Sequence, residues 1–489
     1  MTFVLKTAKN EYELAIGLEV HCEITSASKL FSRTSARFGA APNTEVSFFD
    51  AGFPGQLPRL DEFCIEQAVR TGLGLSATIN AYSVFARKHY FYADLPSGYQ
   101  ISQFTEPLVS GGWLEVQDDQ GAPKKIRIER LHVEQDAGKL THDADPSRSM
   151  VDLNRAGVGL MEIVSRPDLS SPREVAGYLR QLRALVRWLG TCDGNMDEGS
   201  MRCDINISLR PRGAKTLGTR TETKNVNSIR FAEKVVEFEM ARQAEILDAG
   251  GKVLQETRLF DETRSETRPM RTKEDAIDYR YFPDPDIMPL RLPEGFVERI
   301  KAAMPELPLA RRERFKAEFG LSDYDADQLT SDRALSEYFE AVAKSAGDGK
   351  SAANWILSEL FAHLARRNLD IKDSPVDAEK LSGLIGLVKD STVSGKTAKE
   401  VLEMMFDEPS KSAAEIVASR GLEQITDTSA IEAAAAKVLS SAPDQVANYR
   451  AGKTALFGWF VGQTLKELKG QGNPDLVNKV LKAKLDIPA

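Results

Sequence analysis

The sequence predicts an α+β protein with an antiparallel-sheet-rich domain over residues 1–292, an all-helical domain over 293–407 and a small helical tail domain over 408–489. Alternation of apolar and polar residues recurs in the first segment and indicates half-buried strands. Proline-bearing punctuation near Pro293 then introduces long runs with helical spacing, and a second break follows at 407–410. At 489 residues the chain is also too long for one ordinary core.

Two segments show the strand pattern most clearly. In 14–24 every even-numbered residue is apolar, while the opposite face carries Glu19 and His21. In 201–210 the odd-numbered residues are apolar instead. The polar face of that second strand carries Arg202, Asp204 and Asn206.

A third predicted strand, 126–134, has a phase slip near Arg130, as a β-bulge would produce. Beyond the slip, His132, Glu134 and Asp136 share one face. Alternation of this kind is typical of antiparallel sheets with one open face, whereas parallel βαβ arrays bury both faces. We therefore expect several strands to present acids, amides and arginines to one cleft, with the acids exposed.

The clearest helix of the first segment begins at residues 171–174, a capping box with Pro172 at the first helical position. Its apolar stripe ends before Gly190, where a C-terminal cap belongs. The tail shows two more helical stripes, at 456–468 and 476–485. Gly470 ends the first of these, and Asn473 caps the second.

Bulk composition is that of a globular protein, with 42% hydrophobic and 28% charged residues. The sequence has no apolar stretch long enough for a bilayer and no secretory signal at its start, so we expect no membrane association. Four cysteines without a disulfide framework indicate a reducing, cytoplasmic setting. The net charge of −8 disfavours general coating of nucleic acid and directs attention to local basic patches.

The residue types of the predicted cleft suit metal and anion binding. Glu19 and His21 lie roughly 7 Å apart on their strand face, and Mg²⁺ prefers oxygen ligands of this kind. Taken alone, this pair favours a solvated polar face. The acids at 132–136 and the polar face of 201–210 make the cleft interpretation equally compatible with the sequence.

Phosphate binding is less clearly marked, because the sequence has neither a G-x-x-x-x-G-K-[ST] loop nor a convincing G-x-G-x-x-G turn. Residues 50–58 could present backbone amides to an anion, or could form an ordinary turn. Arg87 and Lys88 precede a run of aromatics and could grip phosphates, or could belong to an amphipathic strand. The cysteines on apolar faces are expected to be buried and inert.

Short segments along nearly the whole chain resemble one family, the B subunit of the three-subunit amidotransferase that makes Gln-tRNA(Gln) and Asn-tRNA(Asn) from mischarged precursors. These segments are IGLEVH (16–21), FGAAPNT (38–44), KHYFY (88–92), GYQISQF (98–104), DLNR (152–155), GSMRCD (199–204), TKNVNS (223–228) and DYRYFP (278–283).

The resemblance implies a cradle domain with a kinase site that uses ATP and Mg²⁺, then a helical domain and a tRNA-binding tail. It implies a heterotrimer in which a glutaminase A subunit releases ammonia and a small C subunit is the third member. The B subunit would phosphorylate the misplaced side-chain carboxylate, and ammonia would displace the phosphate. The resemblance leaves open whether Glu-tRNA(Gln), Asp-tRNA(Asn) or both are substrates.

Site roles follow from the same resemblance. Glu19, His21 and Glu134 are implied as Mg²⁺ ligands, direct or through water. Contacts to phosphate or carboxylate are implied for Lys88, Arg202 and Arg87. Catalytic roles are implied for Lys88 and Arg202. The expected wall residues of the nucleotide site are Glu162, Glu198 and Asp204.

Two departures from the family pattern stand out. The segment 31–57, where many members bind structural zinc through paired cysteines, has no cysteine here, so we expect no zinc. Gln135 replaces the second acid of the block that begins at His132. A non-catalytic tRNA-docking scaffold is the alternative function. A related archaeal-type subunit is disfavoured because only a short bridge, about 283–308, stands where that type has an inserted domain.

The tail carries more lysines than acids. The acids of the stretch 452–489 are Glu467, Asp475 and Asp486. Its lysines are Lys453, Lys466, Lys469, Lys479, Lys482 and Lys484. Lys479 and Lys482 are three residues apart on the last helix and can face a partner together. Charge alone favours a solvated helix face, but the resemblance of 452–453, 461–463 and 473–474 to the family's tail favours tRNA binding.

Overall fold

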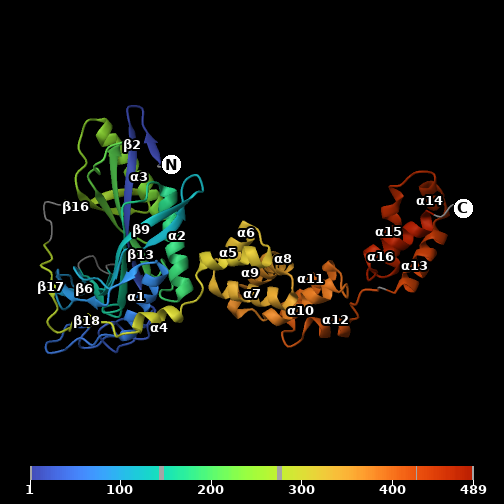
Figure 1. Cartoon of the computed structure of the whole chain (residues 1–489), viewed down its shortest axis with the longest axis horizontal. Coiled ribbons are helices and arrows are strands. Elements are labelled where there is room, and N and C mark those ends of the chain that lie inside the picture. The colour runs from blue at the N-terminus through green and yellow to red at the C-terminus, as the bar shows by residue number, and fades with distance from the viewer. Residues whose placement is uncertain (1–2, 142–147, 273–277, 426, 487–489) are drawn as a thin grey trace. The chain divides into compact units, whose positions relative to one another are not determined.

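The structure is a computed structural model that describes residues 3–141, 148–272, 278–425 and 427–486 (Figure 1). The chain divides into two compact units, Met1–Leu307 and Pro308–Ala489. Strands gather in the first unit and helices form the second, which confirms the α+β prediction. Among the described residues, no helix is long and apolar enough to cross a membrane.

The first unit is built on one large, strongly twisted sheet. Over the described residues its strand order is β16-β15-β14-β13-β2-β12-β9-β7-β3, with β1 added to β2 and β8 to β9. The strands are β1 (Val4–Lys6), β2 (Glu11–Glu23), β3 (Thr78–Ile79), β7 (Val109–Ser110), β8 (Trp113–Gln117), β9 (Pro123–Gln135), β12 (Gly159–Ser165), β13 (Met201–Pro211), β14 (Thr221–Val226), β15 (Glu256–Asp261) and β16 (Glu266–Thr272).

Three small sheets accompany it. One has the order β17-β5-β6 (Phe282–Pro283, Phe85–His89, Tyr99–Gln103). The others pair β10 (Lys139–Thr141) with β11 (Met150–Asp152), and β4 (Tyr82–Ser83) with β18 (Leu290–Arg291). The first of these carries Lys88, and the aromatic residues Tyr90–Tyr92 follow directly after its strand β5.

The strands predicted from alternation are confirmed as β2, β9 and β13. β12 lies between β2 and β9, and β13 lies on the other side of β2. Each of these four strands is antiparallel to its neighbour. The predicted bulge is also present: Val164 pairs with Arg130 but Ser165 pairs with Ile128, so β9 has one extra residue there. This extra residue decides which side chains of β9 face the same way as those of β2.

The sheet is rich in antiparallel pairs, as predicted, but it includes one parallel pair. β14 and β15 are parallel, and the helix α3 (Ile229–Asp248) connects them as a crossover, so one βαβ unit lies near the edge of the sheet. The expectation of an open polar face was wrong, since Asp204 is 5% and Asn206 9% exposed. Alternation reports which side chains share a face, but it does not report what later segments lay over that face.

The main helices of the first unit are α1 (Glu62–Gly74), α2 (Pro172–Leu189), α3 and α4 (Phe296–Ala302). Ser171 caps α2 by accepting a hydrogen bond from the Glu174 amide, and Gly190 ends it with φ 70°. The capping box is incomplete, because the Glu174 carboxylate accepts from the Ser170 amide (2.7 Å) and from Lys124. That carboxylate is buried and needs the lysine as its counter-ion.

The second unit is helical throughout its regular structure, and it contains two hydrophobic cores, one over Phe315–Val417 and one over Ile431–Leu485. Its helices are α5 (Pro308–Phe319), α6 (Asp323–Leu329), α7 (Arg333–Ala346), α8 (Gly349–Asn354), the π-helical turn Trp355–Leu360, α9 (Phe361–Arg367), the 3₁₀ turn Ile371–Asp373, α10 (Ala378–Lys389), α11 (Gly395–Asp407), α12 (Ala413–Arg420), α13 (Thr428–Ser441), α14 (Pro443–Arg450), α15 (Leu456–Glu467) and α16 (Pro474–Leu485).

Both predicted tail helices are confirmed as α15 and α16, and the Asn473 side chain caps α16 by accepting from the amides of Asp475 and Leu476. The boundary between the two units follows Leu307, and α4 belongs to the first unit. The three-domain division at 292/293 and 407/408 stays a prediction.

Candidate active site

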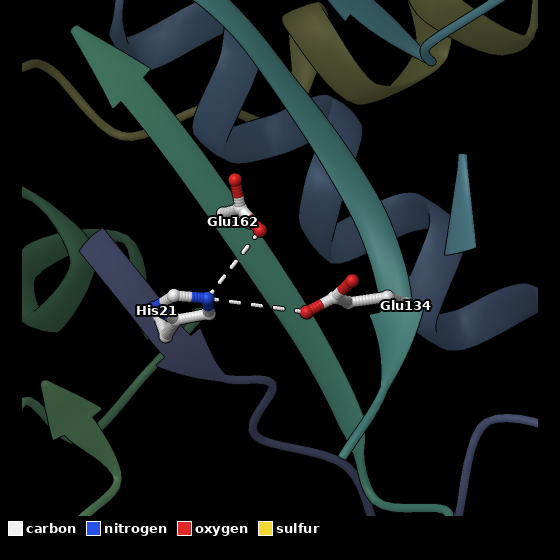
Figure 2. Close-up of side chains that lie close together, drawn as sticks. All are labelled: His21, Glu134 and Glu162. Carbon is white, nitrogen blue, oxygen red and sulfur yellow. Dashed lines mark ion pairs between the residues drawn. The ribbon is translucent and has the colours of Figure 1, made fainter. Parts of the chain in front are cut away.

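Three side chains from neighbouring strands converge on the buried polar face of the sheet (Figure 2). His21 on β2 pairs in register with Glu162 on β12, which in turn pairs with His132 on β9. The His21 Nε2 atom lies 3.4 Å from Glu162 Oε2 and 4.0 Å from Glu134 Oε1. Strand register therefore brings together residues that are more than a hundred positions apart in the sequence.

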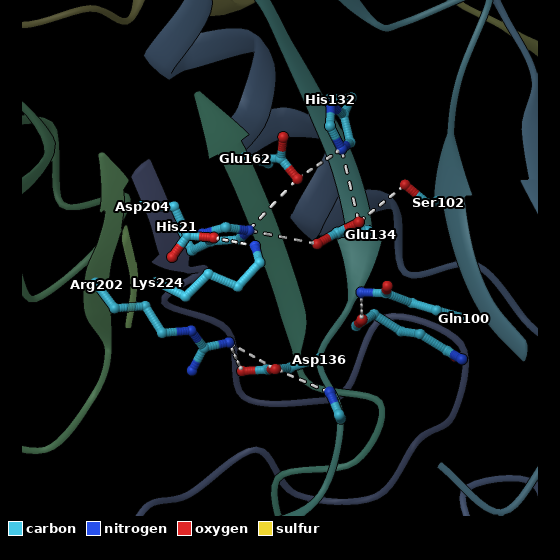
Figure 3. Close-up of polar contacts among 12 residues, drawn as sticks. His21, Gln100, Ser102, His132, Glu134, Asp136, Glu162, Arg202, Asp204 and Lys224 are labelled. Carbon is cyan, nitrogen blue, oxygen red and sulfur yellow. Dashed lines mark hydrogen bonds and ion pairs between the residues drawn. The ribbon is translucent and has the colours of Figure 1, made fainter. Parts of the chain in front are cut away.

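A second imidazole completes the group (Figure 3). His132 Nε2 lies 3.3 Å from Glu162 Oε2 and 3.6 Å from Glu134 Oε2. The Ser102 hydroxyl donates a 2.9 Å hydrogen bond to the same Glu134 oxygen, so one carboxylate oxygen of Glu134 is held while the other faces His21. Glu134 is 2% exposed, so the expectation of exposed cleft acids was wrong for this residue.

The charges of this group are strongly coupled. Burial lowers the pKa of His132, but the carboxylates of Glu162 and Glu134 outweigh it and raise the pKa to about 9. The pKa of His21 is raised as well. Burial lowers it, but the carboxylate of Glu162 outweighs that effect. Conversely, burial raises the pKa of Glu162, but the two imidazoles hold it well below its usual range.

The donor atoms of His21, Glu134 and Glu162 fit a small divalent cation. Two ligands of one Mg²⁺ ion, each bound at about 2.0–2.1 Å, lie at most about 4.2 Å apart. Both distances from His21 Nε2 fall within that limit. The other ring nitrogen of His21, Nδ1, is buried without a hydrogen-bond partner among the described residues. Two carboxylate oxygens and one imidazole are therefore available to a metal.

Glu19 does not join this group. It clusters instead with Asp204 and Glu222, and it accepts a 3.0 Å hydrogen bond from Asn206 Nδ2. Burial and then the charge of Glu162 raise the pKa of Glu19. Of the predicted trio Glu19, His21 and Glu134, the structure brings the last two together and puts Glu162 beside them.

We call His21, His132, Glu134 and Glu162 the acid cluster. An open pocket of about 550 Å³ lies beside it, and we call this the acid pocket. Its lining includes His21 and Glu134 together with the cations Lys88, Arg202 and Lys224. Lys88 lies over the rings of Tyr279 (5.2 Å) and Tyr90 (5.8 Å). Burial lowers the pKa of Lys88, but Glu134 outweighs it and the net pKa is raised, so this ammonium stays charged.

Two of the cations are held by carboxylates. Arg202 Nη2 donates to both oxygens of Asp136, at 2.6 and 2.7 Å. Lys224 Nζ donates to Asp204 Oδ2 at 2.6 Å (Figure 3). Glu198, also predicted for the nucleotide site, is exposed and lines the same pocket.

The side chains of Arg87 and Lys88 point to opposite faces of β5, because successive residues of a strand alternate between its two faces. The Arg87 guanidinium pairs with Asp284 (2.8 Å) and Asp286 (2.9 Å) and lies over the ring of Tyr99 (4.2 Å). Arg87, Tyr99 and Asp286 line a second pocket of about 320 Å³, together with Gln135. Arg87 is therefore not brought into the acid pocket, and neither is Gln135.

The loop at 50–58 forms turns rather than an open cradle of amides. The amides of Ala51, Gly52 and Phe53 donate to carbonyls of residues 47–49, just before the loop, at 2.9–3.0 Å. The Asp50 carboxylate pairs at 3.3 Å with the buried Lys29 ammonium. The ordinary-turn interpretation is thus the one that holds for this loop.

Sequence reasoning did not assign a role to Asp136, Lys224 or Arg155, which all line the acid pocket. Alternation placed Asp136 on the same face as Glu134, but no particular contact was predicted for it. Lys224 stands in the segment 223–228, and its position on β14 next to Asp204 depends on pairing between β13 and β14. All four cysteines are buried and free, as expected.

The predicted tail lysines lie at the surface of the second unit. Lys453, Lys466, Lys469, Lys479 and Lys482 are exposed, and the last two lie on α16. The apolar stripe of the same helix is buried, with Val477 and Leu481 fully covered. These lysine side chains are therefore accessible to a partner.

The sheet-rich unit with its charged pocket is a catalytic domain of the GatB/GatE class, whose family model matches residues 14–298. A second family model, described as the GatB domain, matches residues 337–485. The chain belongs to the GatB family.

Relatives support this over the full length of the chain. It is 54% identical over 485 residues to the B subunit of the aspartyl/glutamyl-tRNA(Asn/Gln) amidotransferase from Paramagnetospirillum magneticum, with 99% of this chain and 100% of the relative covered. It is 55% identical over 482 residues to the protein of the same name from Gluconobacter oxydans, with 99% of each covered. The corresponding protein of Acidiphilium cryptum is 54% identical over 488 residues, with 100% of each covered.

Proposed function

We propose that the acid pocket uses ATP to phosphorylate the side-chain carboxylate of a glutamyl or aspartyl group on mischarged tRNA, after which ammonia displaces the phosphate. The chain is the B subunit of a tRNA-dependent amidotransferase, a ligase that forms Gln-tRNA(Gln) and Asn-tRNA(Asn). The observation that carries the proposed chemistry is the convergence of His21, Glu134 and Glu162 beside a pocket lined by lysine and arginine.

Phosphoryl transfer depends mainly on positioning and on neutralisation of charge. Lys88 and Arg202 supply fixed positive charge in the pocket, and the Asp136 carboxylate orients the Arg202 guanidinium through two hydrogen bonds. Ser102 and His132 hold the Glu134 carboxylate in place. These contacts set the side chains before any substrate arrives, so little reorganisation is needed on binding.

The residues that would hold Mg²⁺ are His21, Glu134 and Glu162. Bound there, the ion would neutralise negative charge on the phosphates of ATP. Glu19 belongs to the second acid group with Asp204 and Glu222, and we assign it to the wall of the nucleotide site or to a water-mediated contact. The absence of zinc at 31–57 stays a prediction.

Ammonia must come from a partner. We expect a glutaminase A subunit and a small C subunit to assemble with this chain, because the sequence offers no resemblance to a serine-lysine amidase centre. The four cysteines are all buried, which removes them as candidate thiol nucleophiles. The tail lysines on α15, α16 and the loops around them are proposed to contact the tRNA backbone.

The test is an assay of the chain assembled with an amidase partner. ATP-dependent conversion of Glu-tRNA(Gln) or Asp-tRNA(Asn) should occur with glutamine, and ammonia should replace glutamine at least in part when the partner is omitted. The pure chain should not hydrolyse glutamine. Robust glutaminase activity of the pure chain, or amidation that does not consume ATP, would overturn the proposal.

The alternative of a non-catalytic scaffold predicts a different outcome for Glu134→Gln. A scaffold would bind tRNA and support amidation as before, whereas a catalytic subunit should lose amidation and keep its affinity for tRNA.

A further inference from the structure

Five aromatic rings follow one another beside the acid pocket, and we call them the aromatic row. They are Tyr92, Tyr90, Tyr279, Tyr281 and Phe104, taken in spatial order. Successive ring centroids are 5.9, 6.0, 6.1 and 4.2 Å apart. The last pair, Tyr281 and Phe104, is stacked with an interplanar angle of 4°.

The middle of the row lies at the acid pocket, and both of its ends are exposed at the surface. Tyr90 lines the acid pocket, and both Tyr90 and Tyr279 lie beneath the Lys88 ammonium. At one end, Phe104 is 54% exposed although it is stacked on a neighbour. At the other end, Tyr92 is 50% exposed. A large aromatic ring that stays open to water next to a charged pocket indicates a binding surface rather than a core.

Backbone pairing holds the row in place. Tyr90 and Phe104 directly follow the paired strands β5 and β6, and Tyr281 directly precedes β17. The His89 amide donates to the Tyr279 carbonyl (2.9 Å), and the Tyr90 hydroxyl donates to Gln100 Oε1 (3.1 Å). The rings are therefore positioned before a ligand arrives, which reduces the entropy lost on binding.

The chemistry of such a surface suits unpaired nucleobases. Bases without a pairing partner stack on aromatic side chains, and each stacked base contributes about 1–3 kcal/mol. Arg280 lies between Tyr279 and Tyr281 in the chain and is exposed, so a cation is at hand for a phosphate of the same strand.

The proposed function places a single-stranded ligand here. The amino acid of an aminoacyl-tRNA is esterified to the unpaired 3′ end, so the nucleotides next to it must pass over the rim of whichever pocket holds the reacting carboxylate. We propose that the aromatic row is the stacking platform for the unpaired 3′-terminal nucleotides of the mischarged tRNA, with Phe104 and Tyr281 as the outermost contact. This proposal rests on the proposed function, because it takes the acid pocket as the site of amidation.

The test uses the assembled amidotransferase with Phe104→Ala and Tyr281→Ala. A tRNA that carries 2-aminopurine in place of its 3′-terminal adenine reports stacking through fluorescence quenching. Both variants should lose most of the quenching and should raise the KM for mischarged tRNA by about 10-fold or more, the equivalent of one stacked base. The KM for ATP and the kcat at saturating tRNA should stay within about two-fold of the parent, because neither ring lines the acid pocket.

Two further variants make the result specific. Phe104→Tyr keeps the ring face and should behave as the parent, whereas Phe104→Leu keeps apolar bulk without a ring and should behave as the alanine variant. Phe53→Ala removes another exposed ring, 55% exposed and paired with Phe48 at the rim of the second pocket, and should change nothing.

Unchanged quenching and tRNA KM in both alanine variants would overturn the proposal. A raised KM for ATP with an unchanged KM for tRNA would also overturn it, because the row would then hold the adenine of ATP. If the parent bound the labelled tRNA with quenching but did not amidate it, the proposed function would fail while the platform stood.

Discussion

Glu162 lies between two imidazoles on the central strands, and each imidazole approaches it within hydrogen-bonding or ion-pairing distance. Sequence analysis gave this residue only a place in the wall of the nucleotide site. Its position in register opposite both His21 and His132 makes it a central member of the acid cluster. A substitution of Glu162 therefore tests the proposed metal site directly.

Glu162→Gln should lower the rate of ATP-dependent amidation by about 100-fold or more, because one charged oxygen ligand of the proposed Mg²⁺ site is lost. Mg²⁺ titration by calorimetry in the presence of a non-hydrolysable ATP analogue should show a matching loss of affinity. Glu129→Gln serves as the control, since Glu129 is a solvent-exposed acid at the bulge of β9 that pairs with Arg166. An unchanged affinity for Mg²⁺ in Glu162→Gln would remove Glu162 from the ligand set.

Asp136→Asn should weaken the hold on Arg202, because an amide offers only one acceptor where the carboxylate accepts two hydrogen bonds. We expect kcat to fall by roughly 10- to 100-fold and the free energy of unfolding to fall by about 1–3 kcal/mol, since a half-buried guanidinium loses its counter-ion. Steady-state amidation and thermal unfolding of the full chain measure the two effects.

The matched control for that change is Asp168→Asn, which makes the same substitution in a pair whose arginine, Arg127, is exposed. Asp168→Asn should lower the free energy of unfolding by less than about 1 kcal/mol. If Asp136→Asn retained full kcat, Arg202 would be positioned without Asp136 or would play no part in the reaction.

At the scale of elements, the cross-strand pairing of β13, β2, β12 and β9 brings the site residues together. The small β17-β5-β6 sheet supplies Lys88, and the segments next to its strands supply the aromatic row. The helical unit is stabilised differently, with ion pairs between helices as well as apolar cores. Glu340 on α7 is the clearest case, because it accepts hydrogen bonds from Arg314 on α5 and from Lys344 on its own helix.

Burial raises the pKa of Glu340, but Arg314 and Lys344 outweigh it and lower the pKa from 4.5 to about 2. A carboxylate whose pKa is lower in the folded state stabilises the fold above its unfolded pKa and loses that contribution as pH falls toward the folded value. At pH 7 Glu340→Gln should therefore lower the free energy of unfolding by about 1–2 kcal/mol. The difference from the parent should narrow as pH falls below about 4.5 and approaches 2.

Thermal unfolding of the full chain at a series of pH values checks this. Glu337→Gln is the control on the same helix, because Glu337 forms an exposed pair with Arg333 and should change stability little at any pH. A difference between Glu340→Gln and parent that stayed constant from pH 7 down to 3 would show that the ion pairs contribute nothing.

At the scale of the whole molecule, a net charge of −8 means that affinity for tRNA must come from local positive surface. Lys479 and Lys482 are exposed on α16, whose opposite side is buried in the tail core. The double variant Lys479→Ala/Lys482→Ala should raise the apparent KM for mischarged tRNA. It should also reduce the slope of log affinity against log salt by about one unit for each phosphate that the variant no longer binds.

Filter-binding measurements of tRNA affinity between low and moderate salt test that prediction, with ATP binding as the check that the first unit is intact. Lys396→Ala removes an exposed lysine at the start of α11 and should leave the slope unchanged. Deletion of residues from Asp407 onward should have a larger effect in the same direction. Equal slopes for the double variant and the parent would place tRNA recognition elsewhere.

The sequence by itself determined the strands β2, β9 and β13, the β9 bulge, the capped helices and the family, because periodicity, caps and short motifs are local properties. It also indicated His21, Glu134, Lys88 and Arg202 as neighbours of one pocket. Only the tertiary structure decided that Glu162 rather than Glu19 joins His21 and Glu134. It also decided that Arg87 faces a second pocket and that β14 and β15 run parallel. Alternation assigns a side chain to one of two faces, but strand register and crossover connections are set by packing between distant segments, which no local pattern contains.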